Sequence, residues 1–302
     1  MNDALRALSD ALEPVRSSLT SLEPFFATPA SFLARLVSDG KSRSSVVDTL
    51  FAHFLISIAC CALILVLSIA FSRKVIVGAK TFDALKEHER STWHTNMCTF
   101  WPAFVVTAYA LPAILTYDGK VNSFRSVVSM NTARACGMSV GYMTWDLLVI
   151  VTRWNDQRTA YGGAGALWLF IVHHVFSIIL WPYALSRGLC AYHINYFLVS
   201  EVTNFNMSLR WILSTLKKTH TKLYLFNGLG WIPLFISVRV VVIPKLYSAF
   251  VNSDWRVFTS AQYWVAALTL PIPSMLNLYW TKQIVEGAAK FLLTGEDITK
   301  QD

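Results

Sequence analysis

The sequence has few charged residues and no extended polar block. Charged residues make up 15% of the 302 residues, and hydrophobic residues make up 54%. A soluble domain carries about a quarter of its residues as charged ones, so this composition argues against a soluble globular protein. The mean hydropathy is +0.45. No internal repeat at a fixed period is visible, which leaves an inverted-repeat transporter without support.

Cysteine is also scarce, and the basic charge has no nucleic-acid pattern. The five cysteines form no CxxC pair and lie within or at the edge of apolar stretches. We therefore expect small apolar core residues without disulfides. The net charge is +8. The basic residues are not interleaved with aromatic ones as on a nucleic-acid-binding surface, so we expect no nucleic-acid partner.

What the chain does contain is a series of apolar stretches. Each is close to the roughly 20 residues that a helix needs to cross the hydrocarbon core of a bilayer. We predict seven such spans, at residues 46–71, 96–117, 126–151, 164–185, 189–212, 223–244 and 261–281. The connecting loops are short, so the predicted fold is an all-α polytopic membrane protein with about seven transmembrane helices, six or so of them in one bundle.

The distribution of Lys and Arg predicts the orientation. The loops after the first, third and fifth spans, together with the tail at 293–302, hold most of these residues. The more basic side is normally cytosolic. This places the C-terminus in the cytosol and residues 1–45 in the lumen. Apolar residues recur at helical spacing in that segment, at positions 5, 8, 12, 15 and 19, which predicts an amphipathic helix. Residues 46–84 form the first span and its cytosolic loop.

Two adjacent histidines, His173 and His174, lie in the middle of the fourth span. Ionisable groups at membrane depth are costly and normally face a protein-lined cavity. An unpaired imidazole there is expected to be neutral, because desolvation disfavours its charged form, and a neutral imidazole is a competent base or nucleophile. Ser177 lies one turn further along. The alternative is that both histidines only hydrogen-bond neighbouring helices together.

The fifth span is expected to carry one continuous polar stripe. It consists of His193, Phe197, Glu201, Asn204 and Ser208. A carboxylate in the middle of a membrane must be protonated, paired or hydrated. We expect Glu201 to pair with one of the two histidines, and Arg210 to reach the cytosolic surface or to pair with a carboxylate.

Other polar residues lie in the third and sixth spans. Asp146 and Tyr142 share a helix face one turn apart, and Arg134 also can face inward. The alternative for Asp146 is solvation, or a pair with Arg153, near the cytosolic end. We expect Arg239 to be structural and to reach the lumenal surface. Adjacent helical residues point about 100° apart, so the histidine pair cannot ligate one ion well and no metal site is expected.

The order of these motifs resembles the TLC (TRAM, LAG1 and CLN8) domain family. The resemblance is carried by Gly141-Tyr142 through Asp146, by His173-His174, and by Glu201-Val-Thr203 leading to Arg210-Trp211, and it covers residues 85–292. It implies a helical bundle around a lipid-sized cavity in the endoplasmic reticulum or a related membrane, with a role in lipid synthesis, transport or sensing.

One departure separates the chain from the ceramide synthases of that family, which join an acyl group from acyl-CoA to a sphingoid base. In those enzymes a His pair is followed by an essential His-Asp-x-x-Asp segment, where this chain has Ser200-Glu201-Val-Thr-Asn204. The chain is therefore more similar to the non-synthase TLC domain-containing proteins.

The leading hypothesis is a protein that binds a membrane lipid in its cavity, needs no cofactor and contributes to lipid homeostasis. The ligand-binding residues would be Tyr142, Ser177, His193, Asn204 and Arg210. The first alternative is a lipid N-acyltransferase that uses acyl-CoA as co-substrate, whose phosphates would lie near Arg153 and Lys217. Its catalytic residues would be His173, His174, Glu201 and Asp146. The second alternative is a membrane cargo receptor or chaperone.

Overall fold

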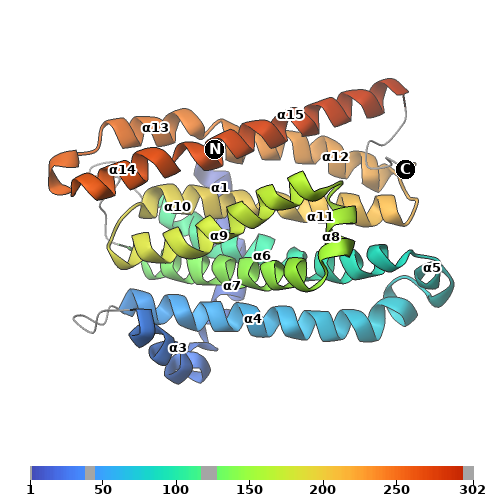
Figure 1. Ribbon diagram of the computed structural model, residues 1–302, viewed down its shortest axis with the longest axis horizontal. Helices are drawn as coiled ribbons and strands as arrows, with labels where there is room; N and C mark the ends of the chain where they lie inside the picture. The colour runs from blue at the N-terminus through green and yellow to red at the C-terminus, as the bar shows by residue number, and fades with distance from the viewer. Residues whose placement is uncertain (1, 38–44, 117–127, 295–302) are drawn as a thin grey trace.

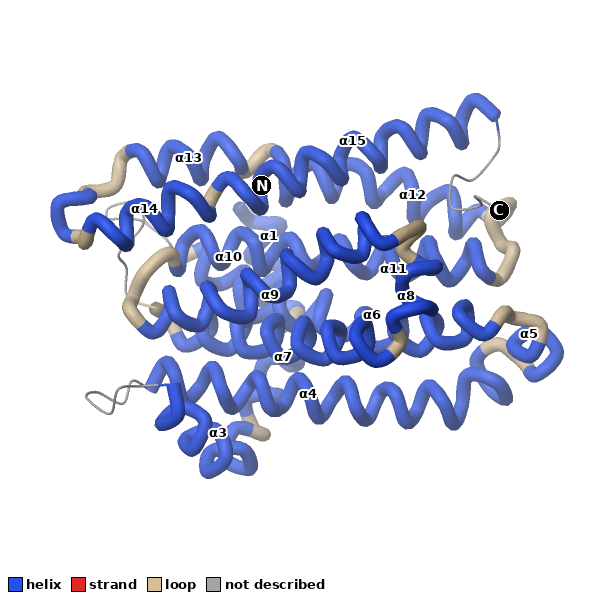
Figure 2. The backbone as a smooth tube through the Cα atoms, viewed as in Figure 1, coloured by secondary structure: helices blue, strands red, loops and turns tan. Residues whose placement is uncertain are grey.

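The computed structural model describes residues 2–37, 45–116 and 128–294. All the regular elements in these ranges are helical, and most helices run alongside one another in an elongated bundle (Figures 1 and 2). The long helices are α4 (Ser45–Phe71), α6 (Glu87–Leu115), α7 (Met130–Thr152), α9 (Ala164–Ser186) and α15 (Pro271–Thr294). The shorter ones are α1 (Asn2–Ala11), α2 (Glu13–Thr20), α3 (Glu23–Val37), α5 (Ala79–Asp83), α8 (Trp154–Ala160), α10 (Ala191–Val199), α11 (Thr203–Thr215), α12 (Lys222–Phe235), α13 (Ile243–Val251) and α14 (Ser260–Thr269). The predicted all-α class is confirmed.

Five helical segments in the described ranges are long and apolar enough to cross a membrane. They are Ser45–Ile76, Glu87–Leu115, Met130–Thr152, Ala164–Ser186 and Lys222–Val251. They correspond to five of the seven predicted spans, and this part of the prediction is confirmed.

The other two predicted spans are interrupted. The 261–281 span divides into α14 and α15 at Pro271, a residue that lacks an N–H and restricts the backbone before it. The 189–212 span divides into α10 and α11 at a 3-10 turn, Ser200–Val202. The predicted continuous helix is therefore helical throughout residues 191–215, but it is not a uniform α-helix, because residues 200–202 form a 3-10 turn.

Helices α6 and α7 form the centre of the bundle. They are largely buried, whereas α4, α9 and α12 keep most of their surface exposed. Figure 1 shows α4 on one side of this centre and α12 to α15 on the other. Large apolar side chains are exposed on the outer helices, for example Leu63, Val66 and Ile69 on α4. A continuous exposed apolar face of this kind suits contact with lipid.

Small residues allow α4 and α7 to approach closely. Gly137 and Gly141 on α7 lie against the backbone of α4, where a Cβ on Gly141 would come within 2.6 Å of the Phe54 carbonyl oxygen. The Ser57 hydroxyl donates a hydrogen bond of 2.7 Å to the Met138 carbonyl. Close backbone approach at small residues is a common way to pack helices in membranes.

The N-terminal helices lie against the bundle and are held by buried polar contacts. The Arg16 guanidinium donates a hydrogen bond of 2.8 Å to the Ala108 carbonyl of α6, and the Tyr109 hydroxyl donates one of 2.9 Å to the Arg16 carbonyl. Arg134 of α7 pairs with Glu23 at 2.7 Å. Arg134 therefore secures α3 to the bundle.

The connections gather at the two ends of the bundle. Helices α5 and α8, the loop at residues 216–221 and the end of α15 lie at one end, and the α13–α14 connection lies at the other (Figure 1). The loops with most of the Lys and Arg residues are thus at the same end.

Candidate functional site

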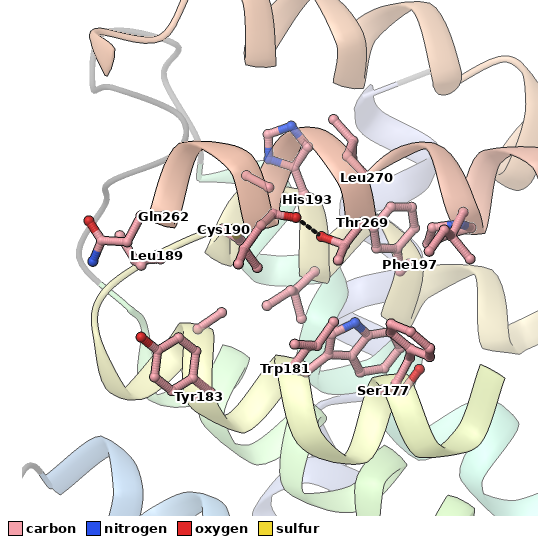
Figure 3. Close-up of a pocket in the computed structure, with 18 of the residues that line it drawn as sticks. Ser177, Trp181, Tyr183, Leu189, Cys190, His193, Phe197, Gln262, Thr269 and Leu270 are labelled. Carbon is pink, nitrogen blue, oxygen red and sulfur yellow. Dashed lines mark hydrogen bonds between the residues drawn. The ribbon is translucent and has the colours of Figure 1, made fainter. Parts of the chain in front are cut away.

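A groove of about 400 Å³ lies between α9, α10, α14 and α15 (Figure 3). Ser177 and Trp181 on α9 face Thr269 and Leu270 across it. Most of the lining is apolar, including Phe176, Trp181, Ile194, Phe197, Ala266 and Leu270. An apolar groove with a few polar groups is the usual form of a site for a small amphiphile.

A much smaller space with several polar side chains, which we call the chamber, lies next to the groove. His173, Trp181, Phe197, Pro273 and Leu276 line both the groove and the chamber. Further chamber residues are Ser200, Glu201, Arg239, Asn277 and Trp280. Its volume is about 20 Å³, close to the roughly 15 Å³ that one water molecule requires.

Arg239 is the main polar anchor of the chamber. Its side chain is buried, with 8% of the residue exposed. Nε donates to the Thr203 hydroxyl at 3.0 Å, and Nη1 donates to Asn277 Oδ1 at 3.1 Å. Nη2 donates to the Ser200 carbonyl at 3.0 Å and to Asn204 Oδ1 at 3.4 Å.

The expectation that Arg239 reaches the lumenal surface was therefore wrong. The helical segment continues to Val251, beyond the predicted end of the span at residue 244. Arg239 consequently lies well inside the segment, where a charged side chain must find partners within the protein.

Two local departures from α-helical geometry meet at this residue. Arg239 belongs to a π-helical turn, Ile236–Val240, and its guanidinium contacts the 3-10 turn Ser200–Val202. Such irregular turns are frequent at functional sites. The Ser200 carbonyl accepts hydrogen bonds from Arg239 and from the Thr203 hydroxyl, so the polar contacts are concentrated where the helix is interrupted.

Contrary to the prediction, Glu201 does not pair with a histidine. Its Oε2 accepts a hydrogen bond of 2.6 Å from the Asn204 amide nitrogen, while the Asn204 amide oxygen accepts from Arg239. The Asn204 side chain therefore lies between a buried carboxylate and a buried guanidinium. Glu201, Asn204 and Arg239 form one hydrogen-bonded unit, in which an ionised Glu201 would balance the charge of Arg239.

His174 turns away from the groove and toward α7. Its Nδ1 donates a hydrogen bond of 2.8 Å to the Phe170 carbonyl, and its Nε2 lies 3.0 Å from Asp146 Oδ2. Because Nδ1 carries a proton, the contact between Nε2 and the carboxyl oxygen requires a further shared proton. The alternatives for Asp146, solvation or a pair with Arg153, were wrong, since Asp146 is buried against His174.

His173 faces the groove and the chamber. Its ring lies edge-on to Trp280, with 6.0 Å between the ring centres. Within the part of the chain that the structure describes, its ring nitrogens make no hydrogen bond. His173 is therefore the imidazole of the pair that is available to a ligand.

Of the other residues predicted to bind a ligand, some line the groove and some lie elsewhere in the bundle. Ser177 and His193 line the groove, and His193 Nε2 donates to the Leu246 carbonyl at 3.1 Å. The Tyr142 hydroxyl lies 2.9 Å from the Thr99 hydroxyl, between α6 and α7.

Arg210 lies over the Tyr224 ring at 4.7 Å, so neither Tyr142 nor Arg210 belongs to the lining of the groove or the chamber. Among the residues with described positions, no three His, Cys, Asp or Glu side chains lie close enough to hold a metal ion.

Arg239, Asn277 and Trp280 are the site residues that sequence reasoning missed. The sequence does contain a signal for Arg239, which is the only charged residue between Trp231 and Ile243. Asn277 and Trp280 lie in a stretch, residues 276–280, whose sequence resembles the last helix of the TLC domain. Their place at the site depends on how α15 packs against the π-helical turn, which the resemblance does not give.

The fold and this buried polar site define a helical integral membrane protein. The TLC domain family model matches residues 92–286, and the chain belongs to that family. TLC domain-containing protein 4-B of Danio rerio is 25% identical over 226 residues, which cover 71% of this chain and 80% of that protein. TLC domain-containing protein 4 of Homo sapiens is 25% identical over 233 residues, covering 74% of this chain and 82% of that protein. The predicted similarity to non-synthase TLC proteins is confirmed.

Proposed function

We propose that the protein binds a membrane lipid in the groove between α9, α10, α14 and α15, and thereby contributes to membrane lipid homeostasis. The observation that supports this proposal most is that an apolar groove and a small polar chamber lie next to each other and share lining residues. An amphiphile has the same division, because its apolar body and its polar end need different surroundings.

Exposed apolar side chains on the helices that border the groove support the same proposal. Ile179 on α9 and Leu268 on α14 are more than half exposed on the outer faces of the helices that border the groove. A lipid that enters between these faces stays in apolar surroundings until its polar end reaches the chamber.

We further propose that the basic end of the bundle faces the cytosol, with the N-terminus lumenal and the C-terminus cytosolic, in the endoplasmic reticulum membrane. The excess of Lys and Arg at that end supports the orientation. The family resemblance is the basis for the organelle.

The test is lipid retention by a variant with a filled groove. Ala266 lines the groove and is buried, so Ala266→Trp should occupy the space that the lipid needs. Ala289→Trp on the exposed surface of α15 is the matched control. We expect purified wild type and the Ala289 variant to retain an acyl lipid detectable by mass spectrometry, and the Ala266 variant to lose it. Equal lipid content in all three proteins, or no lipid in the wild type, would contradict the proposal.

A second candidate function is N-acyl transfer from acyl-CoA to a sphingoid base. The observation that favours it is that His173 and Glu201 both line the chamber. His173 would take the proton of the attacking amine as a general base. Arg153 and Arg90 line a separate pocket between α4, α6 and α7. CoA phosphates bound to these arginines would therefore lie in a different pocket from His173. Incubation with acyl-CoA and a sphingoid base should give an amide with wild type and none with His173→Ala; no amide with wild type would exclude this function.

A further inference from the structure

We infer that the chamber selects amphiphiles whose polar end is a single uncharged hydroxyl group, and that it disfavours anionic headgroups. This inference rests on the proposed lipid binding in the groove. It adds the chemical class of the polar end, which follows from the size, charge and hydrogen-bonding groups of the chamber.

The first argument is size. The chamber measures about 20 Å³, which is enough for roughly one water-sized group. A hydroxyl oxygen fits such a space, whereas a phosphate or a choline group does not. The adjoining groove of about 400 Å³ then holds the apolar body.

The second argument is charge. The titratable side chains that line the chamber are His173, Glu201 and Arg239. Glu201 and Arg239 are connected through the Asn204 amide, and an ionised Glu201 balances the charge of Arg239. The neighbouring His174–Asp146 pair adds no net charge when it shares a single proton. An anionic headgroup would therefore lose its hydration without gaining a cation that is free to neutralise it.

The donors of Arg239 support this conclusion. A guanidinium has five N–H groups, and Arg239 makes four hydrogen bonds to protein oxygens, on Thr203, Asn277, Ser200 and Asn204. Bidentate binding of a carboxylate or phosphate needs two parallel N–H groups from one guanidinium. Arg239 cannot offer both without breaking its contacts to the protein.

The third argument is hydrogen-bond complementarity. Glu201 uses Oε2 to accept from Asn204, and Oε1 remains as a second acceptor. A neutral His173 ring provides one donor and one acceptor. A hydroxyl has one donor and two acceptor positions, so it can donate to Glu201 and accept from His173.

The experiment uses the full chain in phosphatidylcholine nanodiscs with three photoactivatable probes of equal chain length. One carries a terminal alcohol, one a sulfonate and one an ammonium group. We expect the alcohol to label peptides of α9 and α14 with at least about tenfold higher affinity than the sulfonate, a difference of about 1.4 kcal/mol in binding free energy. Competition with a long-chain alcohol and with a sterol then distinguishes a flexible from a rigid apolar body.

Two variants change the charge of the chamber in opposite directions. Glu201→Gln leaves Arg239 without its acid, and should shift the preference toward the sulfonate. Asn277→Asp adds an acid beside Arg239 Nη1, where the structure places Asn277 Oδ1 at 3.1 Å, and should shift the preference toward the ammonium probe. Asp254→Asn is the control, because it removes a carboxylate that faces Arg256 at 2.9 Å on the exposed end of the bundle.

The outcomes separate this inference from the proposed function. Equal or stronger labelling of the groove by the sulfonate in wild type would overturn the inference and leave lipid binding intact. Unchanged preferences in folded Glu201 and Asn277 variants would also overturn it. Labelling of the groove by none of the probes would contradict the proposed function itself. If Glu201→Gln does not fold, the wild-type comparison and Asn277→Asp decide.

Discussion

The two faces of α9 border regions of different character. We call α4, α6, α7 and the N-terminal helices the packed region, and the groove with its chamber the open region. His174 faces the packed region and contacts Asp146 at 3.0 Å. Its neighbour His173 lines the open region. The comparison teaches that a histidine's position around the helix, and not only its depth in the bilayer, decides whether it holds helices together or faces a groove.

The packed region uses its buried polar groups to connect helices. Arg16 and Tyr109 exchange hydrogen bonds with the backbone of each other's segment, and Arg134 pairs with Glu23. Polar groups that are fully paired in this way specify which helices pack together. The open region contains one such unit, centred on Arg239, and it lies at the deep end of the groove.

The largest expected effect on stability comes from breaking the hydrogen-bonded unit of Arg239, Asn204 and Glu201. Arg239→Leu leaves the Glu201 carboxylate buried without its counter-charge, which should cost about 3–5 kcal/mol of stability. Thermal unfolding of the purified variant measures the loss. The double variant Arg239→Leu/Glu201→Gln should recover part of the melting temperature, because no uncompensated charge remains. Equal melting temperatures of the single and double variants would show that the charge of Glu201 is not balanced by Arg239.

The adjacent histidines provide a direct test of the comparison. His174→Leu leaves the Asp146 carboxyl without its partner in the packed region, which should destabilise the protein by about 2–3 kcal/mol. His173→Leu removes no hydrogen bond within the described residues and should change stability by less than about 0.5 kcal/mol. Melting temperatures of the two variants, measured side by side, check the difference. Equal losses would mean that the two faces of α9 do not differ as we describe.

The glycines give a similar contrast with a smaller effect. Gly141→Ala places a methyl group within 2.6 Å of the Phe54 carbonyl oxygen, and we expect a loss of about 1–2 kcal/mol from overpacking. Gly165→Ala on α9 has open space, since no atom lies within 4 Å of the new Cβ. It should be neutral or slightly stabilising, because Ala favours a helix by about 1 kcal/mol over Gly. Thermal unfolding compares the two, and a stable Gly141 variant would contradict the close approach of α4 and α7.

The helical class and five of the spans could be predicted, because the length of an apolar stretch in the sequence matches the thickness of the bilayer. The interruption at Ser200–Val202 could not, because the side chain that contacts this turn is Arg239, which lies 37 to 39 positions later in the chain. The same limit applies to the histidine pair. The sequence placed both residues at membrane depth, but the direction of each ring depends on the packing of α9 against α7 and α15.

The smallest expected effect tests whether a single hydroxyl group contributes more to stability in the packed region than in the open region. Tyr109→Phe removes a hydroxyl that donates to the Arg16 carbonyl at 2.9 Å and lies 3.1 Å from the Thr20 hydroxyl. We expect a loss of about 1 kcal/mol, the usual net value of a buried hydrogen bond. Tyr183→Phe in the lining of the groove is the control, because Tyr183 is half exposed, and its melting temperature should match that of the wild type. If the N-terminal helices are held mainly by these polar contacts, amide hydrogen exchange in α1 and α2 should also increase in the Tyr109 variant alone. Unchanged exchange there would assign the docking of these helices to apolar contacts.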